Sequence, residues 1–127
     1  MSALIVARPG RMREGLRALL RTIPRIKIVE QVDRGSAALA MVTQKRSTLV
    51  LLDSSLPSEE MWTAVKQIKA KWPQTQCIVV ADTIRQQGMA HTSGADGVLL
   101  KGFAAETLFL TIDEVLMRVG KPNEQNK

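Results

Sequence analysis

Residues 49–53 have the sequence LVLLD, and this segment decides the fold class of the chain. Four consecutive apolar residues predict a strand covered on both faces, because a strand with one exposed face would alternate apolar and polar side chains. Three further short apolar runs have the same continuous character, over 3–6, 77–81 and 97–100. Strands of this kind are typical of parallel sheets that carry helices on both sides.

Segments with helical periodicity separate these strands. Apolar residues at three- and four-residue steps predict a first helix from Met12 to Ile23, which Pro24 ends. Residues 26–32 alternate in part and predict a more exposed strand, and Ser36 is expected to cap a short helix over 36–44. Three further helices are expected, from Ser58 to the Trp72-Pro73 pair, over 85–93 and over 104–119. The pattern over 85–93 is weak, because Gly88 interrupts it.

Five strands that are each followed by a helix imply parallel pairing with right-handed crossovers. The fold class is therefore α/β, an open doubly wound (βα)5 sheet in a single domain over 1–119. Residues 120–127 are polar and contain proline, which predicts a tail or the start of a linker.

Composition excludes several classes of protein. The single cysteine, Cys77, excludes a disulfide framework and a cysteine-rich zinc site. No apolar run approaches the ~20 residues that span a bilayer, and the N-terminus lacks the layout of a signal peptide. The expected location is therefore the cytoplasm, with no membrane contact.

The positive charge of the chain is concentrated at one end. The formal net charge is +6, and residues 1–27 alone contain seven basic residues against one acidic residue. Arg13, Arg17 and Arg21 form a stripe on the first predicted helix. The stripe is either a solvated face or a docking surface for an acidic partner or a phosphate backbone. Only 3% of the residues are aromatic, which leaves no stacking platform for nucleic acid bases.

Polar side chains follow the predicted strands at their carboxyl ends, where doubly wound sheets place their sites. Asp53 ends the central strand, Lys101 ends the last one, and the other candidates are Arg8, Asp82 and Thr83. By position alone, Asp53 is either a loop or capping aspartate or a group that accepts a phosphoryl group or binds a cation. Together with Lys101 it suggests an ion pair or a phosphate clamp.

Three segments resemble a known family: REGLRALL (13–20), LLD followed by LP (51–57) and GADGVLLK (94–101). They are similar to the receiver domain of bacterial two-component response regulators, in particular to the NarL/LuxR-type branch that carries a helix-turn-helix output domain. The resemblance extends from residue 2 to about 118. It implies a flavodoxin-like receiver fold with strand order 2-1-3-4-5.

The resemblance also implies roles for single residues. Asp53 matches the aspartate that a histidine kinase phosphorylates, and Lys101 matches the lysine that follows the last strand. An acidic pair after the first strand normally holds Mg²⁺, but Ala7 and Arg8 occupy these positions. Two further positions also depart from the family. Asp82, which Thr83 follows, occupies the position of a threonine or serine, and Gly102 replaces a proline.

These departures lead to the hypothesis of a degenerate receiver. Mg²⁺ requires several hard oxygen ligands, so no metal or other cofactor is expected here. Arg8 is expected to replace the cation and to pair with Asp53 or Asp82, in a permanent salt-bridge cluster that includes Lys101. Asp82 would repel an incoming phosphoryl group.

The expected function is that of an atypical receiver, not an enzyme, that signals through protein contacts. The resemblance implies a homodimer through the fourth helix, fifth strand and fifth helix, and a histidine kinase or another signalling protein as partner. DNA would be bound only through an output domain outside this chain.

Two alternatives remain. In the first, the chain is a conventional phosphoacceptor modified on Asp53, or one in which Arg8 and Lys101 hold the phosphoryl group without metal. In the second it is a flavodoxin-like cofactor binder, although no phosphate-binding loop follows the first strand.

Overall fold

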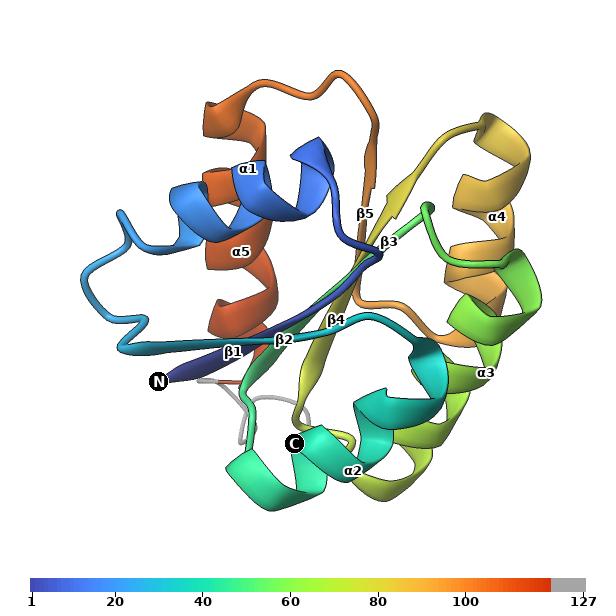
Figure 1. Cartoon of the computed structure of the whole chain (residues 1–127), viewed down its shortest axis with the longest axis horizontal. Coiled ribbons are helices and arrows are strands. Elements are labelled where there is room, and N and C mark those ends of the chain that lie inside the picture. The colour runs from blue at the N-terminus through green and yellow to red at the C-terminus, as the bar shows by residue number, and fades with distance from the viewer. Residues whose placement is uncertain (120–127) are drawn as a thin grey trace, which may run out of the picture.

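The five predicted strands form one parallel sheet in the order β2-β1-β3-β4-β5, which confirms the doubly wound fold class (Figure 1). The structure is a computed structural model that describes residues 1–119, so the predicted tail over 120–127 lies outside the described residues. The strands are β1 (Ser2–Val6), β2 (Ile28–Val32), β3 (Leu49–Asp53), β4 (Gln76–Ala81) and β5 (Gly97–Leu100).

Helices cover both faces of the sheet (Figure 1). One face packs against α1 and α5, and the other packs against α2, α3 and α4. The helices are α1 (Arg11–Leu20), α2 (Ala38–Lys45), α3 (Ser58–Lys71), α4 (Ile84–Ser93) and α5 (Ala105–Val119), and a 3₁₀ turn, η1 (Gly35–Ala37), precedes α2.

The central strand β3 contributes to both hydrophobic cores. Leu49 and Leu51 pack with α1 and α5, whereas Val50 and Leu52 pack with α2, α3 and α4. All four side chains are fully buried. This two-sided burial is the physical reason for the continuous apolar run. The edge strand β2 is more exposed, in line with its partial alternation.

The first helix ends earlier than the sequence predicts. α1 stops at Leu20, whereas the apolar pattern predicts a helix to Ile23. The backbone N–H groups of Thr22 and Ile23 donate to the carbonyls of Leu19 and Leu20, so a tighter turn with three-residue steps replaces the last helical residues. Ile23 still packs against the core, which is why the pattern included it.

The predicted cap of α2 is wrong. Ser36 lies inside η1, and α2 begins two residues later without a side-chain cap. The turn is held by a contact distant in sequence, because the backbone N–H of Gly35 donates to the carboxylate of Glu60 in α3. A carboxylate from another helix thus satisfies one of the free N–H groups at this end.

The weak fourth helix is present and continuous through Gly88. Its ends explain why: the Thr83 hydroxyl accepts the Gln86 N–H at 3.1 Å, and Gly94 ends the helix with φ of +101°. An N-cap and a left-handed glycine at the C-terminus together offset the poor helix propensity of the interior. No helix within residues 1–119 has the length and apolar composition needed to cross a membrane.

Two glycines give opposite predictions for alanine substitution. A Cβ at Gly88 would contact nothing within 4 Å, so Gly88→Ala should raise the free energy of unfolding by about 0.5–1 kcal/mol through helix propensity. A Cβ at Gly35 would lie 2.7 Å from the Glu60 carbonyl oxygen, so Gly35→Ala should lower the free energy of unfolding by about 1–3 kcal/mol. Urea denaturation of both variants measures these changes, and equal effects would contradict the packing at Gly35.

Candidate functional site at the carboxyl edge of the sheet

Asp53 is the last residue of β3, and its side chain is fully buried. One carboxylate oxygen, Oδ2, accepts the backbone N–H of Ser55 at 3.1 Å. The other oxygen, Oδ1, is buried without a hydrogen-bond partner among residues 1–119. The carboxylate therefore organises its own loop through one oxygen and leaves the second unused, which is unusual for a buried group.

Lys101 and Asp82 form an ion pair across the same edge. Lys101 Nζ lies 3.3 Å from Asp82 Oδ1, with about two-fifths of each side chain exposed. The backbones on both sides are also fixed: the Lys101 N–H donates to the Ala81 carbonyl at 2.9 Å, and the Asp82 N–H donates to Gln86 Oε1 at 2.7 Å. The pairing of Asp82 with Lys101 expected from the sequence is thus present, and it connects the loops that follow β4 and β5.

The Thr83 hydroxyl is used within α4. It accepts the N–H of Gln86 as the N-cap of the helix. This contact turns the hydroxyl toward the first turn of α4 and gives Thr83 a structural role at the site.

Arg8 does not make the ion pair that the sequence predicts. The salt bridges within residues 1–119 do not join Arg8 to Asp53 or Asp82. Its backbone N–H donates to Ser55 Oγ at 3.0 Å, and its exposed side chain lines a surface cavity of about 500 Å³ beside Asp33 and Glu60. The physical reason is hydration: pairing with the buried Asp53 would remove water from the guanidinium, whereas the cavity leaves it in solvent.

Comparison with known proteins settles the family. The family model of the response regulator receiver domain matches residues 4–113, which extend from within β1 to within α5. The chain belongs to the response regulator receiver domain family.

Two curated relatives are similar to this receiver over most of its length. The transcriptional regulatory protein YdfI of Bacillus subtilis is 30% identical over 108 residues, which cover 83% of this chain and 50% of YdfI. The transcriptional regulatory protein CiaR of Streptococcus pneumoniae is 31% identical over 98 residues, covering 76% of this chain and 44% of CiaR. The receiver spans about half the length of the curated relatives that it matches.

Solved structures agree on the fold. The receiver domain of an HD domain-containing protein from Pseudomonas fluorescens superposes with a TM-score of 0.83 at 20% identity, covering 97% of this chain and 91% of that one. A CheY-like receiver domain protein from Methanospirillum hungatei superposes with a TM-score of 0.81 at 19% identity, covering 96% and 98%.

Two residues that shape this receiver's site were not among the site residues predicted from the sequence, although Arg13 was predicted to lie in the basic stripe of the first helix. Arg13 Nη1 lies 3.4 Å from the carbonyl oxygen of Ala7, so the guanidinium hydrogen-bonded at the end of β1 belongs to Arg13 and not to Arg8. Ser55 contacts both Arg8 and Asp53. An aspartate followed by serine two residues later is a known turn pattern and could have identified Ser55. No local pattern could have found the contact of Arg13.

The donor set at this edge does not fit Mg²⁺. Mg²⁺ prefers carboxylate oxygens in near-octahedral geometry. Within residues 1–119 no group of three or more histidine, cysteine or acidic side chains could hold a metal ion. The positions after β1 carry a methyl group and a guanidinium, and the carboxylate that follows β4, Asp82, is paired with Lys101.

Gly102 follows Lys101 with φ of +91°. Proline cannot adopt this conformation because its ring fixes φ near −65°. The backbone that this chain adopts after β5 therefore requires a residue other than proline at position 102.

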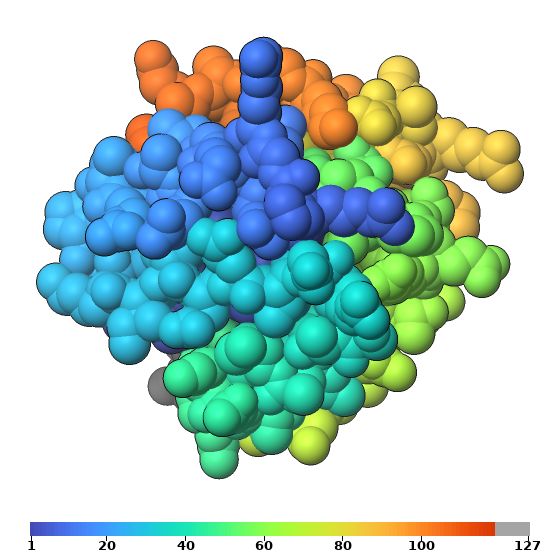
Figure 2. Space-filling view, in the orientation of Figure 1, coloured from blue at the N-terminus to red at the C-terminus, as the bar shows by residue number. Residues whose placement is uncertain are grey.

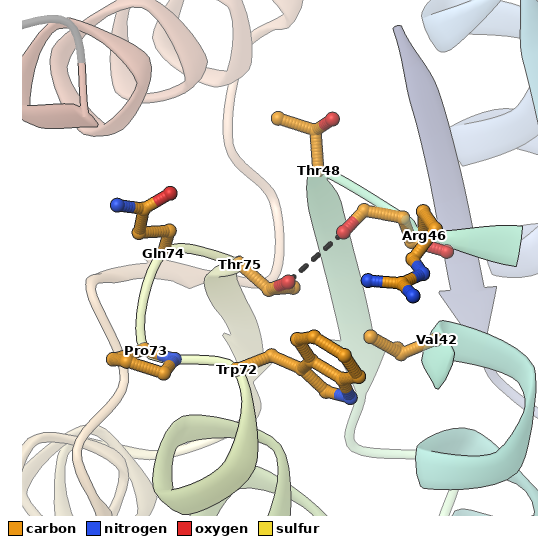
Figure 3. Close-up of a pocket in the computed structure, with 8 residues that line it drawn as sticks. Val42, Arg46, Thr48, Trp72, Pro73, Gln74 and Thr75 are labelled. Carbon is orange, nitrogen blue, oxygen red and sulfur yellow. Dashed lines mark hydrogen bonds between the residues drawn. The ribbon is translucent and has the colours of Figure 1, made fainter. Parts of the chain in front are cut away.

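One of the two tryptophans, Trp72, lies at the opposite, amino-terminal edge of the sheet. Figure 3 shows Trp72 between Pro73 and Val42, with the guanidinium of Arg46 beside its ring, around a cavity of about 410 Å³. The indole N–H donates to Thr43 Oγ1 at 2.9 Å, and Arg46 Cζ lies 4.8 Å from the ring centroid. These contacts give Trp72 a packing role at this edge.

Cys77 lies within β4 and is a fully buried core residue. Burial, reinforced by the nearby Asp96 carboxylate, raises the pKa of its thiol to about 12. The thiol therefore stays protonated at neutral pH and is unsuited to nucleophilic chemistry.

Restoring the missing carboxylates should create a metal site. In the double variant Ala7→Asp/Arg8→Asp, two new carboxylates would join Asp53, and we expect Mg²⁺ binding by isothermal titration calorimetry. Arg11→Asp/Ala18→Asp is the matched control, because it makes the same change in charge at exposed positions of α1. No heat of binding in a folded Ala7→Asp/Arg8→Asp protein would mean that the backbone of this edge has also diverged.

Proposed function

We propose that this chain is an atypical receiver that signals through protein contacts without Mg²⁺-dependent phosphorylation of Asp53. The observation that carries the proposal is the ion pair of Lys101 with Asp82 at 3.3 Å. The resemblance to response regulators assigns this lysine to the phosphoryl group. Here a carboxylate of the protein itself already binds it.

The electrostatics of the edge support the same proposal. Phosphoryl transfer depends on cations that neutralise the charge developing on the phosphoryl oxygens. The positions after β1 provide no carboxylate to hold such a cation, and Asp82 adds negative charge beside Lys101. Asp53 is also fully buried, so a phosphodonor could reach it only after the loop moves.

One observation favours a second candidate function. The unpaired Oδ1 of Asp53 is an oxygen that could attack a phosphodonor. In this alternative the chain is phosphorylated on Asp53 by a histidine kinase, and nearby cations such as Arg13 and Lys101 replace part of the metal charge. We favour the first candidate because a metal ion provides most of the charge stabilisation in this chemistry.

Incubation with a small-molecule phosphodonor and Mg²⁺ distinguishes the two candidates. Intact-mass spectrometry should detect no phosphorylated protein under conditions that modify the Ala7→Asp/Arg8→Asp variant. A stoichiometric gain of one phosphoryl group that disappears in Asp53→Asn would refute the atypical receiver and establish the alternative.

We place this receiver in the regulatory half of a transcription regulator. YdfI and CiaR are named transcriptional regulatory proteins, and the chain spans about half of each. The DNA-binding output domain would lie in the part of such a protein that the match does not cover. A histidine kinase or another signalling protein would be its upstream partner, and the cytoplasmic location stays a prediction.

The surface formed by α4, β5 and α5 supports the proposal of a homodimer. These elements expose five large apolar side chains, Ile84, Met89, Leu100, Leu110 and Met117, of which Ile84 is 77% exposed. Apolar side chains gathered on one surface are typical of interfaces. A self-complementary patch of this kind would pair with its copy about a two-fold axis.

Charge introduced into this surface should dissociate the dimer. Ile84→Glu/Leu110→Glu would place four carboxylates in the interface, and sedimentation velocity should then give a monomer at concentrations where the wild type is dimeric. Ile28→Glu is the control, because Ile28 is also an exposed apolar residue but lies on the opposite edge strand β2. A monomeric wild type, or a dimer that only Ile28→Glu disrupts, would exclude this interface.

A further inference from the structure

The positive charge at the N-terminal end of the chain is not explained by the proposed signalling function. Residues 1–27 contain the whole excess of positive charge, with seven basic residues and Glu14 as the single acid. Six of the seven are arginines. Because these residues lie in and around α1, the charge is localised on one part of the surface, drawn in blue in Figure 2.

Some of these cations are already used by the fold. Arg25 forms a salt bridge with Asp113 of α5, and Arg13 is partly buried and donates to the Ala7 carbonyl. The others make no salt bridge within residues 1–119. We define the α1 basic surface as Arg11, Arg17, Arg21 and Lys27, of which Arg17 is partly buried and the rest are exposed.

The shape of this surface allows close approach. The outward side of α1 between Arg11 and Arg21 carries Gly15 and Ala18, both exposed. A Cβ at Gly15 would contact nothing within 4 Å, so packing does not require glycine there, although glycine costs a helix interior about 1 kcal/mol. At the other end, Arg21 and Lys27 line one surface hollow of about 330 Å³ without an acidic neighbour in its lining.

The chemistry of the surface favours a phosphate backbone over an acidic protein. Protein interfaces are anchored by buried aromatic and apolar side chains. No large apolar residue between 8 and 27 is exposed. Arginine guanidinium groups match phosphate oxygens with two parallel hydrogen bonds, and binding to phosphates requires only correctly spaced charge. Residues four apart on a helix, such as Arg17 and Arg21, present their charges on one side.

We infer that the α1 basic surface binds the phosphate backbone of double-stranded DNA without reading its sequence. The choice of duplex DNA as the polyanion rests on the proposed function as part of a transcription regulator. The receiver would then add affinity to the sequence-specific contacts of the output domain. It would also hold the regulator close to DNA, because two linked sites on one duplex raise the effective concentration of each.

The test is the salt dependence of binding of the full 127-residue chain to a duplex of arbitrary sequence, followed by fluorescence anisotropy. Four cations on phosphates predict that log K falls against log salt with a slope of about −3 to −4. Arg17→Glu/Arg21→Glu should reduce the magnitude of the slope by about two and weaken binding at least tenfold at low salt. The affinity and the salt slope of Arg17→Gln/Arg21→Gln should lie between those of the wild type and of Arg17→Glu/Arg21→Glu. Circular dichroism checks that both variants fold.

Lys45→Glu/Lys66→Glu is the matched control, because it makes the same change in net charge at exposed positions of α2 and α3. This variant should bind almost as the wild type does. Equal weakening by both double variants would mean a response to net charge alone and would overturn the inference, as would the absence of binding at low salt.

Anisotropy measured with polyglutamate of matched length tests whether the α1 basic surface binds an acidic protein instead of DNA. Binding to it as tight as to DNA would assign the surface to an acidic protein and overturn the DNA assignment. The experiment is independent of phosphorylation, so a phosphoryl group on Asp53 would refute the proposed function without changing these binding curves.

Discussion

Burial of the central strand on both faces is the constraint on which the rest of the structure depends. Because β3 packs against α1 and α5 on one side and against α2, α3 and α4 on the other, no polar side chain is tolerated along its length. Polar chemistry is confined to the strand ends. Asp53 is buried at the end of β3, where the loop that follows donates a backbone N–H to its carboxylate.

The same edge separates the residues that build the fold from the polar side chains that follow the strands. The fold depends on the apolar strands and on the small core residue Ala7 that follows β1, whereas Arg8 after it is exposed. Lys101, at the end of β5, pairs with Asp82 at 3.3 Å. An exposed ion pair of this kind contributes little to stability, but it fixes the loops after β4 and β5 relative to each other.

Errors in the predictions from sequence have a common origin. The sequence places Asp53, Asp82 and Lys101 at one edge, and the structure brings them there, because parallel strands carry their carboxyl ends to the same side. It assigns the guanidinium at the end of β1 to Arg8, but the direction of the chain after β1 brings Arg13 there instead. Ser36 has the residue type of a cap, but Glu60, which is distant in sequence, contacts that turn.

The sequence by itself determined the number and order of the strands and helices, the parallel sheet, and the edge where the polar residues collect. These follow from local patterns of apolar residues, which report burial directly. Only the tertiary structure decided which cation faces which anion, which arginines of α1 remain free, and where a loop supplies the missing hydrogen bond. Distance and hydration in the folded chain determine which ion pairs long side chains form, and the spacing of residues along the chain gives neither quantity.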